Sequence, residues 1–205
     1  MRRVRFFAAL LAVSLVAVSP SHGYFVIFKE EFYRLYHIHY QQFPEDVIEN
    51  IYWLEKAAKA DFCNPQKALA KIENEAEWEK YRYLFMLHVN LKLIEQHLRL
   101  GRVFDKRVAH FYDAPWKAEY LRQLDRAEEC YRLGLAYWDE AKGWSEKAND
   151  RKFRFLFLPD VQNWEDERER IASGKLDYQK MLNRELSRIQ RVREDFQGMN
   201  DDGVY

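Results

Sequence analysis

The chain has 205 residues, enough for one domain with a sizeable core, and its 33 lysines and arginines balance its 33 aspartates and glutamates. Interspersed, balanced charges give no broad attraction to nucleic acid or to an anionic membrane surface, so binding through overall charge is excluded. Seven glycines, five prolines and little strand-type alternation argue against a β-sandwich or a barrel.

The N-terminus is typical of a secretory signal peptide. A basic start is followed by an apolar run over residues 6–18, and the small residues Ser21 and Gly23 precede a cut before Tyr24. Loss of residues 1–23 removes three arginines and no acids, which leaves 30 basic against 33 acidic residues. The mature protein is therefore expected in the periplasm or outside the cell.

An uncleaved membrane anchor is the alternative interpretation of the same segment. The apolar run is shorter than the roughly 20 residues that cross a bilayer, but residues 24–28 continue it after a break. In that case the chain would be held at the inner membrane, and only this segment would contact the membrane.

Helical spacing of apolar residues begins directly after the expected cut. Aromatic residues predict a first helix within 24–43, and Pro44 followed by two acids opens a second helix that runs to about Ala60. Asn64 in front of a proline resembles a helix start, which predicts a short helix over about 65–74.

The most apolar helical segment covers residues 75–100. Its apolar arc is wide, so we expect this helix at the centre of the protein, ended by Gly101. A cap and a proline at Asp113 and Pro115 then predict a long helix that ends near Ala148.

The segment 152–159 alternates between polar and apolar residues in the manner of a strand. The alternation places Phe153, Phe155 and Phe157 on one side, and we interpret the segment as an extended connector packed on the helices. Asp160 is expected to cap the helical region that follows.

The last helical region carries dense charge as far as Phe196, with an interruption or bend at Gly174. A mobile tail is expected over 198–205. The elements together predict an all-α fold of antiparallel helical hairpins, either a bundle or a short solenoid, in one domain over residues 24–197 with a charged C-terminal helix.

The sequence shows no pattern that predicts a metal, a cofactor or a catalytic centre. His37 and His39 would point to different sides of a helix, and His88, His97 and His110 lack the carboxylate spacing of a di-iron bundle. Glycine-rich phosphate loops, haem-attachment motifs and zinc-helix motifs are missing from the sequence. An enzyme with an unfamiliar acid pair stays open as an alternative.

Cys63 and Cys130 are the only cysteines. An oxidising compartment permits a disulfide between them, and two buried, reduced thiols are the equally open alternative.

Aromatic residues make up 16% of the chain and include six tryptophans. Most of them recur on helical stripes and are expected in the core, but aromatic side chains are also favoured at binding hot spots. We therefore expect an interaction surface that contains Phe153, Phe155, Phe157, Trp144 and Trp164. The charged helix from Asp160 to Phe196 is a second candidate surface.

The segment 130–137 resembles part of a tetratricopeptide repeat. The Leu-Gly-x-x-Tyr spacing of the first helix of that repeat is formed by Leu133, Gly134 and Tyr137. Glu146 and Asp150 depart from the small and aromatic residues that the second helix of the repeat would have. The resemblance to one degenerate repeat implies helical hairpins that present grooves to other proteins.

An export signal, aromatic helical hairpins and a charged last helix make the chain similar to small periplasmic helical proteins of spirochaetes, some of which build collars around the flagellar motor. These features together favour an exported interaction or scaffold protein that binds other envelope proteins and no nucleic acid. A small-ligand or lipid-binding helical protein, with aromatic residues lining a cavity, is the alternative.

Overall fold

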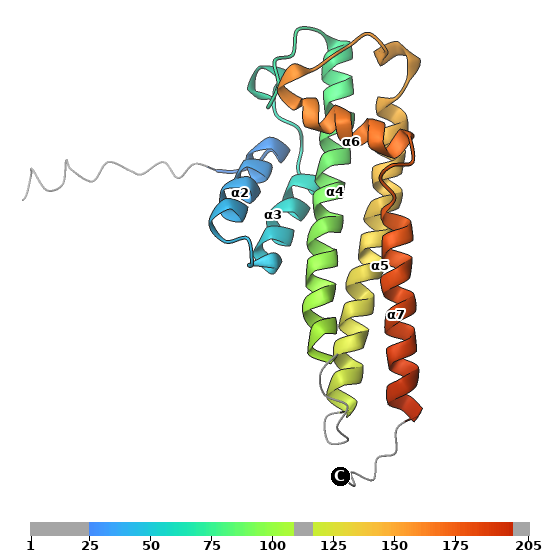
Figure 1. Cartoon of the computed structure of the whole chain (residues 1–205). Coiled ribbons are helices and arrows are strands. Elements are labelled where there is room, and N and C mark those ends of the chain that lie inside the picture. Colours follow the sequence, from blue (N-terminus) through green and yellow to red (C-terminus); the bar gives the residue numbers. More distant parts are fainter. Residues whose placement is uncertain (1–24, 109–116, 199–205) are drawn as a thin grey trace, which may run out of the picture.

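The computed structural model describes residues 25–108 and 117–198, which form six α-helices joined by turns and three short 3-10 segments (Figure 1). The helices are α2 (Lys29–Gln42), α3 (Val47–Lys59), α4 (Glu75–Val108), α5 (Lys117–Ala148), α6 (Gln162–Ala172) and α7 (Tyr178–Gly198). The described residues contain no strand beyond an isolated bridge between Phe28 and Asp61. The predicted all-α fold is therefore confirmed.

Three long helices build the body of the molecule. α4 and α5 run antiparallel along their length. α7 packs against α5 and runs parallel to α4 (Figure 1). α6 crosses the end of this bundle, and the α2–α3 hairpin covers the flank of α4 near the same end (Figure 1).

α4 is the central helix, as its wide apolar arc predicts. Tyr81, Leu84, Phe85, Leu87, Val89, Leu93 and Ile94 have no exposed surface. The neighbouring aromatic rings pack on one another: the ring of Phe85 lies 5.5 Å from Phe62, 5.7 Å from Tyr33 and 5.7 Å from Trp164. Helices from both halves of the chain thus share one core.

Gly101 does not end α4, contrary to the sequence prediction. The helix continues to Val108, and Gly101 is buried inside it against α5. A Cβ atom at this position would lie 2.8 Å from Cζ of Tyr131, so the missing side chain lets the two long helices approach closely.

The second predicted helix is confirmed, with a later start at Val47. Asp46 stands outside the helix as its N-cap, where the side chain accepts a hydrogen bond from Glu49 N at 3.2 Å.

The predicted helix over residues 65–74 is wrong, because only the 3-10 turn η1 (Pro65–Lys67) forms there. The backbone N–H groups that a longer helix would use are bonded elsewhere. Leu69 N donates to the hydroxyl of Tyr81 at 3.1 Å, and Lys71 N donates to Oδ2 of Asp160 at 2.8 Å. Packing against α4 and the start of α6 therefore replaces the local helix.

The same contact corrects the role of Asp160. It does not cap α6, which follows the 3-10 turn η4 (Pro159–Val161) without a side-chain cap. The interruption at Gly174 is confirmed: its φ of 70° ends α6, and Leu176 N returns to the carbonyl of Arg170 at 3.0 Å. The expected signal peptide, the start of the long helix at Asp113 and residues 199–205 lie outside the described residues.

Candidate interaction surface

The connection between α5 and α6, residues 149–161, forms one end of the bundle. It contains the 3-10 turn η3 (Arg151–Phe153), where Asp150 accepts a hydrogen bond from Lys152 N at 2.9 Å, and η4 further on. Three side chains with 1–2% exposure fix the connection to the core; they are Phe153, Leu158 and Val161. Between these anchors, Phe155 is 91% exposed and Phe157 is 57% exposed.

The prediction that Phe153, Phe155 and Phe157 share one face is wrong. The η3 turn and the turn after it break the two-residue alternation, so Phe153 points inward. Its ring packs edge-on at 6.0 Å from the ring of Tyr83 on α4. Phe155 and Phe157 alone remain of the expected phenylalanine surface.

A buried ion pair beneath the exposed part of this connection fixes its backbone. Nζ of Lys80, on α4, donates to the carbonyl of Leu156 at 2.5 Å and forms an ion pair with Glu165 on α6. Lys80 is 5% exposed and Glu165 is 7% exposed. The backbone between Phe155 and Phe157 is therefore fixed before any partner binds, which lowers the ordering cost of binding.

The two tryptophans of the predicted surface have other roles. Trp164 is only 3% exposed, and its ring stacks on His88 at 5.1 Å, so its placement on an interaction surface is wrong. Trp144 is half-buried beside Tyr83, with Nζ of Lys147 at 3.9 Å from its ring centre. Trp144 thus packs against the part of the fold that anchors the connection, and only part of its surface is exposed.

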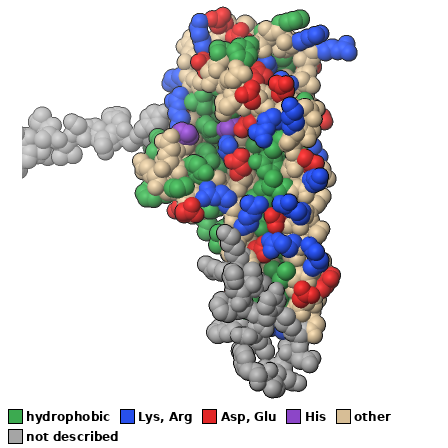
Figure 2. Space-filling view, viewed as in Figure 1, with side chains coloured by type: hydrophobic (Ala, Val, Ile, Leu, Met, Phe, Trp, Pro, Cys, Tyr) green, Lys and Arg blue, Asp and Glu red, His purple; other side chains and the backbone are tan. Residues whose placement is uncertain are grey.

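The second predicted surface, from Asp160 to Phe196, is divided between α6 and α7. The apolar face of α7 is used within the bundle, with Leu182, Ile189 and Phe196 at most 1% exposed. Several of its charges also pair across helices: Arg188 bonds to Asp105 at 2.9 Å, and Arg193 bonds to Asp125 at 2.8 Å. The interleaved basic and acidic side chains on this side of the molecule are visible in Figure 2.

A second group of exposed apolar residues lies on the α2–α3 hairpin. Its members are Ile38, Phe43, Ile48 and Tyr52, which are 46–70% exposed. By their spacing in the sequence, Val47, Ile48, Ile51, Tyr52 and Leu54 form one apolar stripe along α3, but Ile48 and Tyr52 lie outside the buried part of it. This apolar stripe is wider than the surface that α4 and α2 cover. Its width is the feature of the sequence that could have indicated exposed apolar residues on α3.

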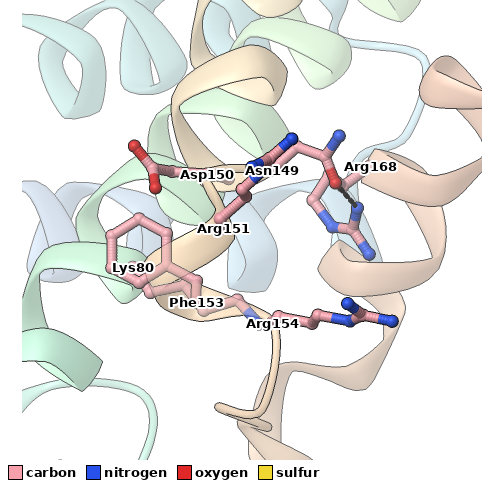
Figure 3. A pocket seen from close by; sticks show the side chains of 8 residues that line it. Lys80, Asn149, Asp150, Arg151, Phe153, Arg154 and Arg168 are labelled. Carbon is pink, nitrogen blue, oxygen red and sulfur yellow. Dashed lines mark hydrogen bonds between the residues drawn. The ribbon is translucent and has the colours of Figure 1, made fainter.

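A basic pocket of about 300 Å³ opens beside the α5–α6 connection. It is lined by Lys80, Ala148, Asn149, Asp150, Arg151, Phe153, Arg154 and Arg168. In Figure 3 the guanidinium groups of Arg154 and Arg168 lie on the same side, and the carboxylate of Asp150 points the opposite way. Sequence reasoning missed this pocket, because Lys80 and Arg168 join residues 149–154 only through the fold.

His88 and His97 are both buried on α4, in different settings. His88 is fully bonded: Nε2 lies 2.7 Å from the hydroxyl of Tyr33, and Nδ1 lies 2.6 Å from Oε2 of Glu167. This chain of contacts joins α2, α4 and α6. Among the described residues, the ring nitrogens of His97 have no hydrogen-bond partner, and burial lowers the pKa of this histidine.

Both cysteines are free, buried thiols. Burial raises the pKa of Cys63 to about 12 and that of Cys130 to about 11, so neither thiol has the lowered pKa of a reactive cysteine. Within the described ranges, no cluster of three or more histidine, cysteine or acidic side chains could hold a metal ion.

In residues 25–108 and 117–198, no helix combines the length and the apolar character needed to cross a membrane. A family model described as "Domain of unknown function (DUF8513)" matches residues 76–199, which contain α4 from its second residue onward, α5 to α7 and the α5–α6 connection. No curated protein and no solved structure matches the chain.

Proposed function

The chain belongs to the family described as Domain of unknown function (DUF8513), and from its surface we propose that it is an exported helical scaffold protein that binds other envelope proteins. The observation that carries the proposal is the exposure of Phe155 and Phe157 on a connection whose backbone is fixed to the core. In line with the resemblance to spirochaete collar proteins, the proposed setting is a flagellar or other periplasmic assembly.

Isolated exposed apolar side chains are common on soluble proteins, so exposure alone is weak support. Phe155 and Phe157 differ because they are two large exposed rings two residues apart in the chain, between buried anchors, with the guanidinium of Arg154 at 5.6 Å from the Phe155 ring. Covering one such ring would contribute about 1.5–3 kcal/mol to binding. Hydrophobic and basic side chains project together at this end of the molecule in Figure 2.

The packing of the other aromatic residues favours this proposal over a ligand cavity lined by aromatic rings. The rings of Trp78, Tyr81 and Phe62 contact one another at 5.3–6.5 Å, and Tyr81 also contacts Trp164 at 5.8 Å. These rings fill the space between the helices. Most of the aromatic residues are thus explained by the core, and Phe155 and Phe157 are among the few that are exposed, together with Phe25, Phe43 and Tyr52.

Export is the second component of the proposal, and it is supported by the basic start, the apolar run over residues 6–18 and the small residues before Tyr24. Fractionation of cells that carry the full chain, with N-terminal sequencing of the recovered protein, tests it. We expect a new N-terminus at Tyr24 in the envelope or secreted fraction. Protein that starts at residue 1 in the cytosol would contradict export.

The docking component is tested with the double variant Phe155→Asp/Phe157→Asp. Proteins cross-linked to wild type in the native envelope are identified, one is purified, and its affinity is measured against wild type and variant. We expect a loss of about tenfold or more, since two aspartates cannot enter an apolar contact. Ile48→Asp, a change at a 70% exposed apolar residue of α3, is the control. Equal affinity for the double variant and wild type would remove this surface from the proposal.

A further inference from the structure

The basic pocket gathers positive charge from three separate parts of the fold. Lys80 belongs to α4, Arg168 to α6, and Arg151 and Arg154 to the α5–α6 connection. Asp150 lines the same pocket, and Glu165 lies behind it as the ion-pair partner of Lys80. Four cations against two carboxylates leave a surplus of two positive charges.

The polar groups of the pocket differ in how many of their hydrogen-bonding atoms are already bonded within the protein. Arg168 donates through Nε to Glu165 at 3.2 Å and through one terminal nitrogen to Asn149 at 2.7 Å, and its second terminal nitrogen has no hydrogen-bond partner in the part of the chain that the structure describes. Oδ1 of Asp150 accepts a hydrogen bond from Lys152 N at 2.9 Å. Among the described residues, neither Arg151 nor Arg154 has a carboxylate within salt-bridge distance.

Arginines placed just after a helix C-terminus can also stabilise the helix dipole, and Arg151 follows the end of α5 closely enough to do so. Stabilising the dipole of α5 requires neither Arg168 from another helix nor an open space between the guanidinium groups. In Figure 3 the head groups of Arg154 and Arg168 border that space, with Asn149 fixing Arg168. Arginine pairs in this arrangement match the oxygen atoms of an oxyanion.

We propose that the pocket binds the phosphate group of a phosphate monoester. A monoester carries about −1.5 to −2 charges at neutral pH, which matches the two surplus positive charges better than one carboxylate does. A volume of about 300 Å³ exceeds the space needed for phosphate alone, and Phe153 and Ala148 form an apolar wall for a small organic part.

The phosphate monoester has two sources that the structure admits: a soluble metabolite, or the headgroup of a phosphatidic acid whose membrane lies against Phe155 and Phe157. Both use the same arginines. The proposal holds whether or not these phenylalanines also bind a protein, so it stands apart from the scaffold function.

The test titrates the purified full chain at constant ionic strength with glycerol 3-phosphate. In a second arm, phosphatidylcholine vesicles with and without phosphatidic acid are added. Arginine side-chain NMR resonances report the soluble ligand, and co-sedimentation reports the vesicles. We expect saturable shifts of Arg151, Arg154 and Arg168 with the soluble ester, or sedimentation that depends on phosphatidic acid. Arg151→Gln/Arg154→Gln should weaken binding about tenfold or more.

Arg170→Gln removes an exposed arginine of α6 outside the pocket and should leave binding unchanged. Absence of binding in both arms, or equal binding by wild type and the double variant, would overturn the proposal. Succinate binding as tightly as glycerol 3-phosphate would also refute a phosphate site. If the double variant unfolds, the wild-type titration decides: shifts confined to arginines outside the pocket contradict the assignment.

Discussion

The carbonyl oxygen of Leu156 accepts a hydrogen bond of 2.5 Å from Nζ of Lys80, a side chain that starts on the central helix of the bundle. One buried ammonium group thus joins α4, the exposed phenylalanines and Glu165 of α6. Stability and the shape of the proposed docking surface consequently depend on the same residue.

Lys80→Met should destabilise the protein by about 1–3 kcal/mol, because Oε1 of the buried Glu165 would lose its cation and the carboxylate would keep only its contact with Nε of Arg168. Lys80→Met/Glu165→Leu removes both charges and should recover most of the loss. Urea unfolding at neutral pH measures the effect. A single variant as stable as wild type would mean that Glu165 is solvated or protonated in the folded state.

Phe153 and Phe155 are two residues apart and should respond in opposite ways to truncation. Phe153→Ala opens a cavity beside Tyr83 and should cost about 3–5 kcal/mol in the free energy of unfolding. Phe155→Ala removes a ring that is 91% exposed and should change stability by no more than about 0.5 kcal/mol. Thermal or urea unfolding of both variants makes the comparison. Equal losses would contradict the inward turn of Phe153.

The helices were predictable because their apolar periodicity agrees with their final packing. Local signals failed where a distant group determined the outcome. Asn64 and Pro65 begin a helical turn, but Tyr81 and Asp160 take the next free N–H groups. Gly101 resembles a helix stop, whereas its function in the fold is to admit the ring of Tyr131.

The candidate site was predictable to the extent that it depends on local sequence. The alternating phenylalanines of residues 153–157 led to the prediction of a surface on the α5–α6 connection, and two of them, Phe155 and Phe157, are exposed. The inward direction of Phe153 follows from a single 3-10 turn, which alternation cannot reveal. The basic pocket needs Lys80 and Arg168, which lie 88 residues apart and meet only after α6 crosses the bundle.

His97 should make the protein sensitive to acid. Burial lowers its pKa below the usual value of 6.5, which outweighs the raising effect of Glu55. A histidine with a lowered folded-state pKa contributes stability above its unfolded pKa, and this contribution is lost as the pH falls through the folded-state value. Stability should therefore decline as the pH decreases from about 6.5.

His97→Leu removes this titration and two ring nitrogens without partners, so it should be less sensitive to acid than wild type. The measurement is urea unfolding at about pH 7.5 and about pH 5. His37→Leu is the matched control, since His37 lies exposed on α2. An unchanged pH dependence in His97→Leu would show that other groups cause the acid sensitivity.

Alanine in place of two helical glycines should have effects of opposite sign. At Gly143 of α5 a Cβ atom would meet nothing within 4 Å, so Gly143→Ala should stabilise the protein by about 0.5–1 kcal/mol through helix propensity. At Gly101 the new Cβ would meet the ring of Tyr131, which has no exposed surface and whose hydroxyl donates to Asp105 at 3.3 Å.

That ring cannot move aside freely, so Gly101→Ala should show a net loss of about 1 kcal/mol or more despite the better helix propensity of alanine. Urea unfolding of the two single variants and of the Gly101→Ala/Tyr131→Phe variant completes the comparison. The double variant frees the ring from Asp105 while it keeps the crowding. If Gly101→Ala is as stabilising as Gly143→Ala, then α4 and α5 are farther apart at this crossing than the structure places them.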